Sequence, residues 1–327
     1  MGAGPLSNKT PGARRFNILV TPKEACELLG HLQGELFKEA EFFPVFGRVE
    51  DSRKLIGLLK DKDGVILDLE KMTRDIFSLC PRLKVISRFG EGCDAIDLKE
   101  AERFNVKVAR TRGVASRAVA MHAVSLILAL THNITENDRN LKKGKWLRRP
   151  NMPERSITLG VMGFGMIGKQ VADIASKIGF KILVYDIIKQ KDRRYNFAGS
   201  VDEICELSDI LTLHFPLTPK TVKIISGNTL KKLKNKFLVN TSRGGLVDEA
   251  ALLKSLETNG IAGYAADVFS REPVADIAER LAAHPKVIAS PHVAALDKDT
   301  AIEMTKRAAV NALSCLKNKH NEVISYV

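Results

Sequence analysis

Short hydrophobic runs alternate with amphipathic stretches along the chain from residue 16 onward. The runs in the first third of the chain are four or five residues long: Phe16–Val20, Gly64–Leu67, Leu83–Ser87 and Val106–Ala109. Apolar runs of this length are typical of strands buried in a parallel sheet. Because helical patterns separate them, they predict consecutive βαβ units.

A second series of the same kind follows a central helix. Ser116–Asn133 is apolar nearly all round, so we expect it to be buried in the protein or against a partner subunit. A basic linker, Lys142–Asn151, follows it, and Asp299–Lys317 forms a last helix. The second set of apolar runs comprises Ile157–Met162, Lys181–Asp186, Ile210–His214, Phe237–Thr241, Ala262–Val268 and Val287–Ser290. The pattern predicts an α/β fold with two doubly wound parallel-sheet domains.

Composition narrows the class of protein. A chain of 327 residues predicts about two domains. Its 51 Lys and Arg against 38 Asp and Glu give a net charge of +13, which favours nucleic acid, an anionic membrane or anionic metabolites as partners. The most apolar stretch, Ala118–Leu130, is too short for a membrane helix, and Met1–Arg15 is interpreted as a disordered leader without a secretory signal. Five scattered cysteines predict no disulfide framework and no metal site, and favour the cytoplasm.

A glycine-rich turn lies between a predicted strand and a predicted helix. It comprises Gly163, Phe164, Gly165, Met166, Ile167 and Gly168. Gly163 permits the tight turn, Gly165 lets a pyrophosphate approach the backbone, and Gly168 allows close packing of helix on strand. Asp186 ends the next strand, where its carboxylate would accept hydrogen bonds from a ribose and favour NAD over NADP. The alternative is a merely tight turn, and basic residues after Asp186 leave use of NADP open.

Three ionisable residues each follow a later predicted strand: Arg243, Glu272 and His292. Ligands of open α/β sheets bind outside the carboxyl ends of the strands, so these residues are expected to share one site. Hydride transfer to a carbonyl also needs a proton, which histidine can give near neutral pH. A carboxylate orients the imidazole and favours its charged form, and arginine holds a substrate carboxylate. Taken singly, each residue also has a structural interpretation: His292 as a loop cap, Glu272 as a solvated turn residue and Arg243 as part of a surface ion pair.

The chain resembles the D-isomer-specific 2-hydroxyacid dehydrogenases. The residues that carry the resemblance are Pro81–Leu98, Gly160–Ala172, His214–Thr221, Asn240–Leu252, Ala265–Pro273 and Ser290–Ala295. The resemblance implies NAD as cofactor and a Rossmann-type NAD domain inserted into a flavodoxin-like substrate domain. The expected bounds are 1–15 for the leader, 16–107 plus 296–327 for the substrate domain and 108–295 for the NAD domain.

The resemblance also implies roles for individual residues. His292 would be the acid/base, Glu272 its partner, and Arg243 the residue that anchors the substrate. The implied cofactor contacts are Gly163, Gly165, Met166, Ile167, Gly168, Asp186, Pro216, Thr221, Thr241 and Asp267. The implied substrate-carboxylate loop comprises Arg88, Phe89, Gly90, Glu91 and Gly92, acting largely through backbone N–H groups. Family members usually dimerise through their NAD domains, and Ser116–Asn133 would supply much of that contact.

Departures from the family pattern bear on the substrate. Where the family commonly reads V-x-N-T-P-G, this chain has Arg110 and Arg112, which with Arg88 could bind a second anionic group or be solvated hinge residues. They favour a phosphoglycerate- or hydroxypyruvate-type substrate and leave a lactate-type substrate open. Glu272, where formate dehydrogenases carry Gln, argues against formate. Inside the central helix the family's A-E-H is replaced by Ala-Met-His, ending at His122.

A non-enzymatic alternative has the same fold. Corepressors of the C-terminal-binding-protein type resemble these dehydrogenases, bind NAD and act as scaffolds. The basic run 231–236 would suit such a context, but a charge run is usually the solvated face of a helix. Aromatic residues make up only 6% of the chain, too few for a stacking platform, so nucleic acid is an improbable partner. The sequence favours the dehydrogenase.

Overall fold

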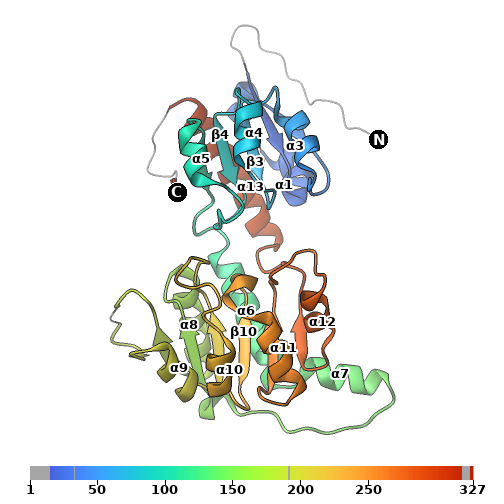
Figure 1. Ribbon diagram of the computed structural model, residues 1–327, viewed down its shortest axis with the longest axis vertical. Helices are drawn as coiled ribbons and strands as arrows, with labels where there is room; N and C mark the ends of the chain where they lie inside the picture. The colour runs from blue at the N-terminus through green and yellow to red at the C-terminus, as the bar shows by residue number, and fades with distance from the viewer. Residues whose placement is uncertain (1–14, 33, 191, 319–324, 327) are drawn as a thin grey trace. The chain divides into compact units, whose positions relative to one another are not determined.

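The computed structural model describes residues 15–32, 34–190, 192–318 and 325–326. The chain forms two compact units (Figure 1), residues 1–115 with 296–327, and residues 116–295. The second unit is therefore an insertion in the first. The predicted leader, 1–15, lies outside the described residues except for Arg15.

The first unit is built on a sheet whose strands run in the order β13-β5-β4-β3-β1-β2. Its strands are β1 (Phe16–Val20), β2 (Ala40–Pro44), β3 (Gly64–Leu67), β4 (Val85–Arg88), β5 (Lys107–Arg110) and β13 (Ser325–Tyr326). The pairs among β1 to β5 are parallel, and β13 is antiparallel to β5. The order 2-1-3-4-5 of the parallel strands is that of the flavodoxin-like fold.

Helices from both ends of the chain complete the first unit. They are α1 (Lys23–Leu28), α2 (Glu35–Glu39), α3 (Ser52–Leu59), α4 (Arg74–Leu79), α5 (Leu98–Arg103) and α13 (Lys298–Leu316). The returning helix α13 packs against α1 and β4, and the Ser87 hydroxyl donates to the carbonyl oxygen of Ala308 at 2.8 Å. The last helix is thus part of this unit's core.

The second unit contains a seven-stranded sheet in the order β12-β11-β10-β9-β6-β7-β8. Its strands are β6 (Thr158–Met162), β7 (Lys181–Tyr185), β8 (Asn196–Phe197), β9 (Ile210–Leu213), β10 (Phe237–Asn240), β11 (Gly263–Ala266) and β12 (Val287–Ala289). All pairs are parallel. The chain leaves β6 in one direction and resumes on its other side at β9, so the carboxyl ends of β6 and β9 form a topological switch point. This is Rossmann-type strand order with a seventh strand.

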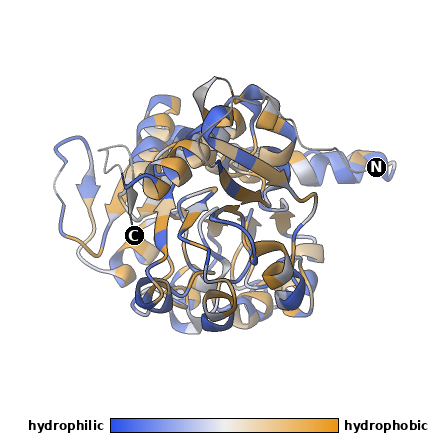
Figure 2. Ribbon diagram, turned by 90° about the horizontal axis from the view of Figure 1, so that it is seen from above, coloured by the Kyte–Doolittle hydropathy of each residue, from blue (hydrophilic) through white to orange (hydrophobic). Residues whose placement is uncertain are grey.

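Seven helices are described in the second unit. They are α6 (Ser116–Thr131), α7 (Ile134–Lys142), α8 (Met166–Ile178), α9 (Val201–Leu207), α10 (Gly227–Lys232), α11 (Glu249–Glu257) and α12 (Ile277–Ala283). The apolar helix α6 packs against α8, β10 and β11 and buries nine of its residues. In Figure 2 most strands carry hydrophobic residues, while the helices show both hydrophobic and hydrophilic residues. The expectation that α6 is buried is therefore met within its own unit.

The predicted fold class is confirmed, with differences at particular elements. The predicted boundary at 107/108 is wrong, because β5 pairs with β4 and so belongs to the first sheet; the units divide after Ala115. The edge strands β2, β8 and β13 were not predicted. Among the described residues no single helix is long and apolar enough to cross a membrane; only α6 and α7 together reach that length, as a pair bent by 58°.

Candidate active site

Each glycine of the turn after β6 has its own steric reason. Gly163 has a φ of +95°, and a Cβ there would lie 2.7 Å from the carbonyl carbon of His214. A Cβ at Gly168 would lie 1.9 Å from the carbonyl oxygen of Gly163. A Cβ at Gly165 would meet nothing within 4 Å. Gly163 and Gly168 thus close the turn, while the open face at Gly165 leaves room for another molecule to approach the backbone.

The start of α8 and the end of β7 complete this turn. Gly165 caps α8 without a side-chain hydrogen bond, so the first N–H groups of the helix are available to an anion. The Asp186 carboxylate accepts from the N–H of Phe164 at 2.6 Å and from the N–H of Ile188 at 2.8 Å. Backbone groups therefore fix the carboxylate beside the turn, where a ribose hydroxyl would meet it.

The remaining predicted cofactor residues divide into three cases. The Thr241 hydroxyl is buried at the end of β10 and has no hydrogen-bond partner in the described part of the chain, so it can serve a bound molecule. The Thr221 hydroxyl donates to the carbonyl oxygen of Pro216 at 2.6 Å and is 1% exposed. Thr221 therefore holds its own loop in place, and its predicted contact with the cofactor stays a prediction. The Asp267 carboxylate is bonded to the loop after β12, and its predicted contact stays a prediction.

Three neighbouring strands carry the predicted catalytic residues. In the sheet β10, β11 and β12 are adjacent, and Asn240, Ala266 and Ala289 stand opposite one another at their ends. Arg243, Glu272 and His292 follow these three strands in turn. The sheet register therefore brings their loops to one edge, as the sequence predicts.

His292 and Glu272 form a direct pair. The Nδ1 atom of His292 lies 2.7 Å from Oε2 of Glu272, and the other carboxylate oxygen accepts from the N–H of Phe269 at 2.9 Å. Burial raises the pKa of Glu272, but the hydrogen bond and charge of His292, the Phe269 N–H and the charge of Arg243 outweigh it, so this pKa lies below its ordinary value. The carboxylate is thus ionised at neutral pH and faces an imidazole.

The loops beside this pair are packed closely together. A Cβ at Gly244 would lie 2.0 Å from the carbonyl carbon of Phe269, so only glycine lets the Arg243 loop approach the Glu272 loop. The buried Glu249 carboxylate accepts from the N–H of Ser270 at 2.7 Å. We predicted no role for Glu249 from the sequence, because nothing in the run Asn240–Leu252 indicates that its carboxylate accepts from Ser270.

The predicted substrate loop, residues 88–92, lies in the first unit at the end of β4. The buried Arg88 guanidinium donates from Nε to the carbonyl oxygen of Gly92 at 2.9 Å and from Nη1 to that of Phe89, and it pairs with Asp68 at 3.6 Å. Its side chain therefore organises the loop, and its predicted binding of a substrate anion stays a prediction.

The backbone of the same loop is only partly used. The N–H of Gly90 donates to the Thr111 hydroxyl at 2.9 Å, and the Glu91 carboxylate accepts from the N–H of Gly113. Within the described residues the N–H groups of Glu91 and Gly92 have no acceptor. These two groups are therefore the ones available to a substrate carboxylate. Arg110, the last residue of β5, is half-buried, and Arg112 just after the strand is exposed.

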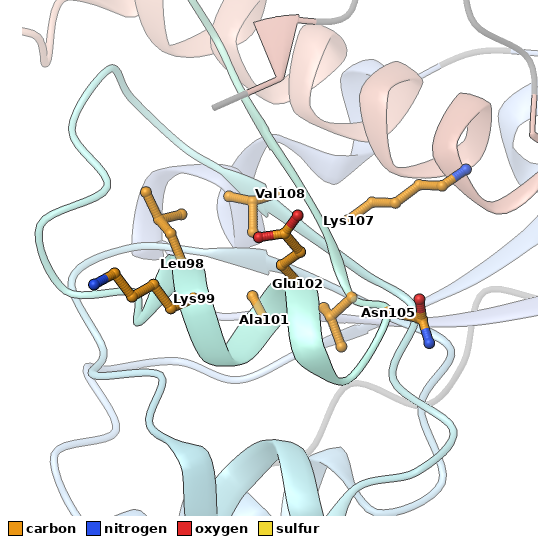
Figure 3. A pocket seen from close by; sticks show the side chains of 8 residues that line it. Leu98, Lys99, Ala101, Glu102, Asn105, Lys107 and Val108 are labelled. Carbon is orange, nitrogen blue, oxygen red and sulfur yellow. The ribbon is translucent and has the colours of Figure 1, made fainter.

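A separate pocket of about 470 Å³ lies along α5 and β5 of the first unit (Figure 3). Its lining mixes apolar and charged side chains and shares no residue with loop 88–92: Leu98, Lys99, Ala101, Glu102, Asn105, Val106, Lys107 and Val108. The described part of the chain contains no group of three His, Cys, Asp or Glu residues that could hold a metal ion.

Known proteins share both the sequence and this architecture. A family model for the NAD-binding domain of D-isomer specific 2-hydroxyacid dehydrogenases matches residues 124–294, more than half of the chain. A glyoxylate reductase of Thermofilum pendens is 34% identical over 309 residues, which cover 91% of this chain and 87% of that protein. The chain belongs to the D-isomer-specific 2-hydroxyacid dehydrogenase family. It is thus an NAD-dependent oxidoreductase, and the scaffold alternative is set aside.

Other relatives of this dehydrogenase differ in substrate. The D-3-phosphoglycerate dehydrogenase of Homo sapiens is 34% identical over 273 residues, which cover 81% of this chain and 51% of that protein. The dehydrogenase described here thus spans about half the length of that relative. A structure of D-lactate dehydrogenase from Aquifex aeolicus, complexed with NAD and lactic acid, has a TM-score of 0.80 and 26% identity, covering 93% of this chain and 96% of that one.

The residues around the glycine turn fit a dinucleotide. The open face at Gly165, the uncapped start of α8 and the partnerless Thr241 hydroxyl are each suited to a bound NAD. In this dehydrogenase Gly163, Gly165, Met166, Ile167 and Gly168 would hold the diphosphate, and Asp186 the ribose.

Proposed function

We propose that the protein interconverts a D-2-hydroxy acid and its 2-oxo acid, with His292 as the acid/base. The observation that carries this proposal is the 2.7 Å contact of His292 Nδ1 with Glu272. An ionised carboxylate only accepts, so Nδ1 carries the proton of that bond. The other ring nitrogen, Nε2, is then the atom that exchanges a proton with the substrate oxygen.

The neighbouring charges assist this exchange. The nicotinamide, when bound, supplies or accepts the hydride. The ionised Glu272 carboxylate holds the imidazole in one orientation. Arg243, half-buried at the edge of the same sheet, offers its guanidinium to the substrate carboxylate. In the first unit, the N–H groups of Glu91 and Gly92, which have no acceptor among the described residues, are suited by themselves to bind a carboxylate.

For the substrate we propose a 2-oxo acid of the hydroxypyruvate or phosphohydroxypyruvate type. Arg110 and Arg112 support it, since Arg110 ends β5 and Arg112 follows it, next to the strand that carries loop 88–92. The two relatives named as a glyoxylate reductase and a D-3-phosphoglycerate dehydrogenase also act on small 2-oxo or 2-hydroxy acids by their names. Because Arg88 is engaged in its loop, a second anionic group would depend mainly on Arg110 and Arg112.

A screen of NADH oxidation tests this function. The substrates are glyoxylate, pyruvate, hydroxypyruvate, phosphohydroxypyruvate and 2-oxoglutarate. We expect the highest kcat/KM with hydroxypyruvate or phosphohydroxypyruvate, and activity with none of the five would overturn the proposal. Replacing Arg110 and Arg112 by alanine should raise KM about tenfold more for phosphohydroxypyruvate than for pyruvate. Arg103→Ala, at the end of α5, serves as the matched control.

We also propose a homodimer formed through the second unit, in which α7 and Trp146, rather than α6, make the contact. Most of α6 is buried within its own unit, so it offers little to a partner. The helix α7 buries no residue, and Ile134 and Leu141 on it are 57% and 59% exposed. Trp146 follows at 81% exposed. Exposed apolar groups of this size are typical of interfaces. Replacing Leu141 and Trp146 by serine should convert a dimer to a monomer in sedimentation velocity.

A further inference from the structure

We propose that His122 on α6 is a positioning residue for His292, acting through Ser290 and Asp267. The inference rests on the proposed role of His292 as acid/base. The Nε2 atom of His122 lies 2.9 Å from the Ser290 hydroxyl oxygen. That hydroxyl donates to Oδ1 of Asp267 at 2.6 Å. The four residues come from three different elements of the second unit, and the chain of contacts ends at the loop that carries His292.

Asp267 holds that loop from behind. Its carboxylate accepts from the N–H of Val293 at 2.9 Å on Oδ1 and from the N–H of Ala294 at 2.9 Å on Oδ2. Its carbonyl oxygen accepts from the N–H of His292, also at 2.9 Å. Asp267 is 1% exposed, so no water competes for these bonds. Three successive backbone N–H groups are therefore fixed by one residue.

His292 needs this support because of its backbone. Its φ is +55°, a left-handed conformation that residues with a Cβ rarely adopt. Such a conformation persists only where the surroundings over-determine it. If the loop relaxed toward an ordinary φ, the imidazole would turn away from Glu272. The bonds of Asp267 thus fix where Nε2 of His292 points.

The protons along the chain of contacts have one consistent arrangement. A carboxylate has no proton to give, so the Ser290 hydroxyl uses its single proton toward Asp267. The Ser290 oxygen then accepts, and His122 must donate from Nε2. The same nitrogen lies 3.6 Å from Oδ1 of Asp267. His122 thus keeps the hydroxyl turned toward Asp267, and without it that hydroxyl is free to rotate away.

A second histidine in the same unit provides the comparison. His132 follows α6 and also makes a side-chain hydrogen bond: its Nε2 atom lies 2.7 Å from Oε1 of Glu154. No contact of His132 leads to Asp267. His132→Ala is therefore a matched control, because it removes a bonded imidazole of the same unit without touching the His292 loop.

Steady-state kinetics of the full-length protein test the inference. Ser290→Ala and His122→Ala should each lower kcat about tenfold, with the KM for the 2-oxo acid and the Kd for NADH unchanged. His122→Gln should restore kcat to within about twofold, because its amide nitrogen can replace Nε2 as donor. The double variant His122→Ala/Ser290→Ala should be no slower than the slower single variant, since both act through one bond. The Tm of each variant is measured alongside.

The outcomes separate this inference from the proposed function. If His122→Ala retains the wild-type kcat, or falls no further than His132→Ala, the positioning role is wrong while the acid/base role of His292 stands. Failure of His122→Gln to restore kcat in a protein of unchanged Tm would overturn it as well. If the unmodified protein reduces none of the 2-oxo acids, the proposed function fails instead, and NADH binding still reports whether the second unit is intact.

Discussion

Two loops at the carboxyl ends of parallel strands, one in each unit, are held by buried side chains of opposite charge. Behind residues 89–92 lies the Arg88 guanidinium, which donates to carbonyl oxygens of its own loop. Behind residues 292–294 lies the Asp267 carboxylate, which accepts from N–H groups. The Arg88 guanidinium binds carbonyl oxygens of its loop, so N–H groups of that loop are left to bind an anion. The Asp267 carboxylate binds N–H groups of its loop, which fixes the position of His292.

The difference assigns different tasks to the two loops. The free N–H groups of Glu91 and Gly92 suit the binding of a carboxylate, which affects KM. The fixed imidazole of His292 suits proton transfer, which affects kcat. Substitutions in the two loops should therefore separate these kinetic constants.

The largest effect is expected from His292→Ala. Removing the proposed acid/base should lower kcat by about 10³-fold. The Kd for NADH, measured by fluorescence titration, should stay within about twofold of the wild-type value. His292 is not among the residues next to the glycines of the dinucleotide turn. A variant that keeps its turnover would show that another group supplies the proton.

The next effect concerns the loop of opposite charge. Arg88→Met should cost about 2 kcal/mol in the free energy of unfolding, because it leaves the carbonyl oxygens of Phe89 and Gly92 without this donor. It should also raise KM for the 2-oxo acid more than it lowers kcat. Urea unfolding and steady-state kinetics measure both. Arg82→Met is the control, since Arg82 pairs with Asp63 at 3.1 Å but is 42% exposed.

A third loop extends the comparison to the dinucleotide turn. Asp186 accepts from the N–H groups of Phe164 and Ile188, so a carboxylate again fixes backbone. Asp186→Ala should lower the ratio of kcat/KM for NAD over NADP about tenfold, because a hydrogen bond to the ribose and a repulsive charge are both lost. An unchanged ratio would mean that another residue distinguishes the two cofactors.

The smallest effect is a pH dependence of stability. The pKa of Glu272 is lowered in the folded protein, so its ionised form stabilises the fold above the pKa of the unfolded chain. This contribution is lost as the pH falls through the folded pKa. The free energy of unfolding should exceed that of Glu272→Gln by about 1 kcal/mol at pH 7, and the difference should shrink below about pH 4.5. A difference that grows on acidification would reverse the assigned sign.

The order of the elements followed from the sequence because the central strands are continuous apolar runs. The three strands that were missed are edge strands: β2 contains Glu41 and ends at Pro44, and β8 and β13 have two residues each. Such strands gain little from burial, so their hydrophobic pattern is weak. The predicted boundary at 107/108 cut through the strand candidate Val106–Ala109, because a local pattern does not show that this strand pairs with β4.

For the site, the sequence predicted which residue types meet at the sheet edge but not which atoms each side chain bonds. Arg243, Glu272 and His292 follow adjacent strands, and strand order alone brings their loops together. The bonds that Arg88 makes in its own loop could not be predicted, because a guanidinium bonds carbonyl oxygens as well as anions and only the direction of the side chain decides between them. For the same reason the bonds of Thr221 and His122 within the protein were not foreseen.

The return of α13 to the first sheet bears on how the protein is made. A ribosome completes residues 116–295 before it reaches α13, so the second unit can fold while the chain is still being synthesised. The first unit has its five parallel strands early but lacks the helix that packs on β4 and α1 until residue 316 is added. The surface that α13 covers therefore stays open while residues 116–295 are being synthesised. The five parallel strands precede the inserted unit in the chain, yet their unit is completed only after it.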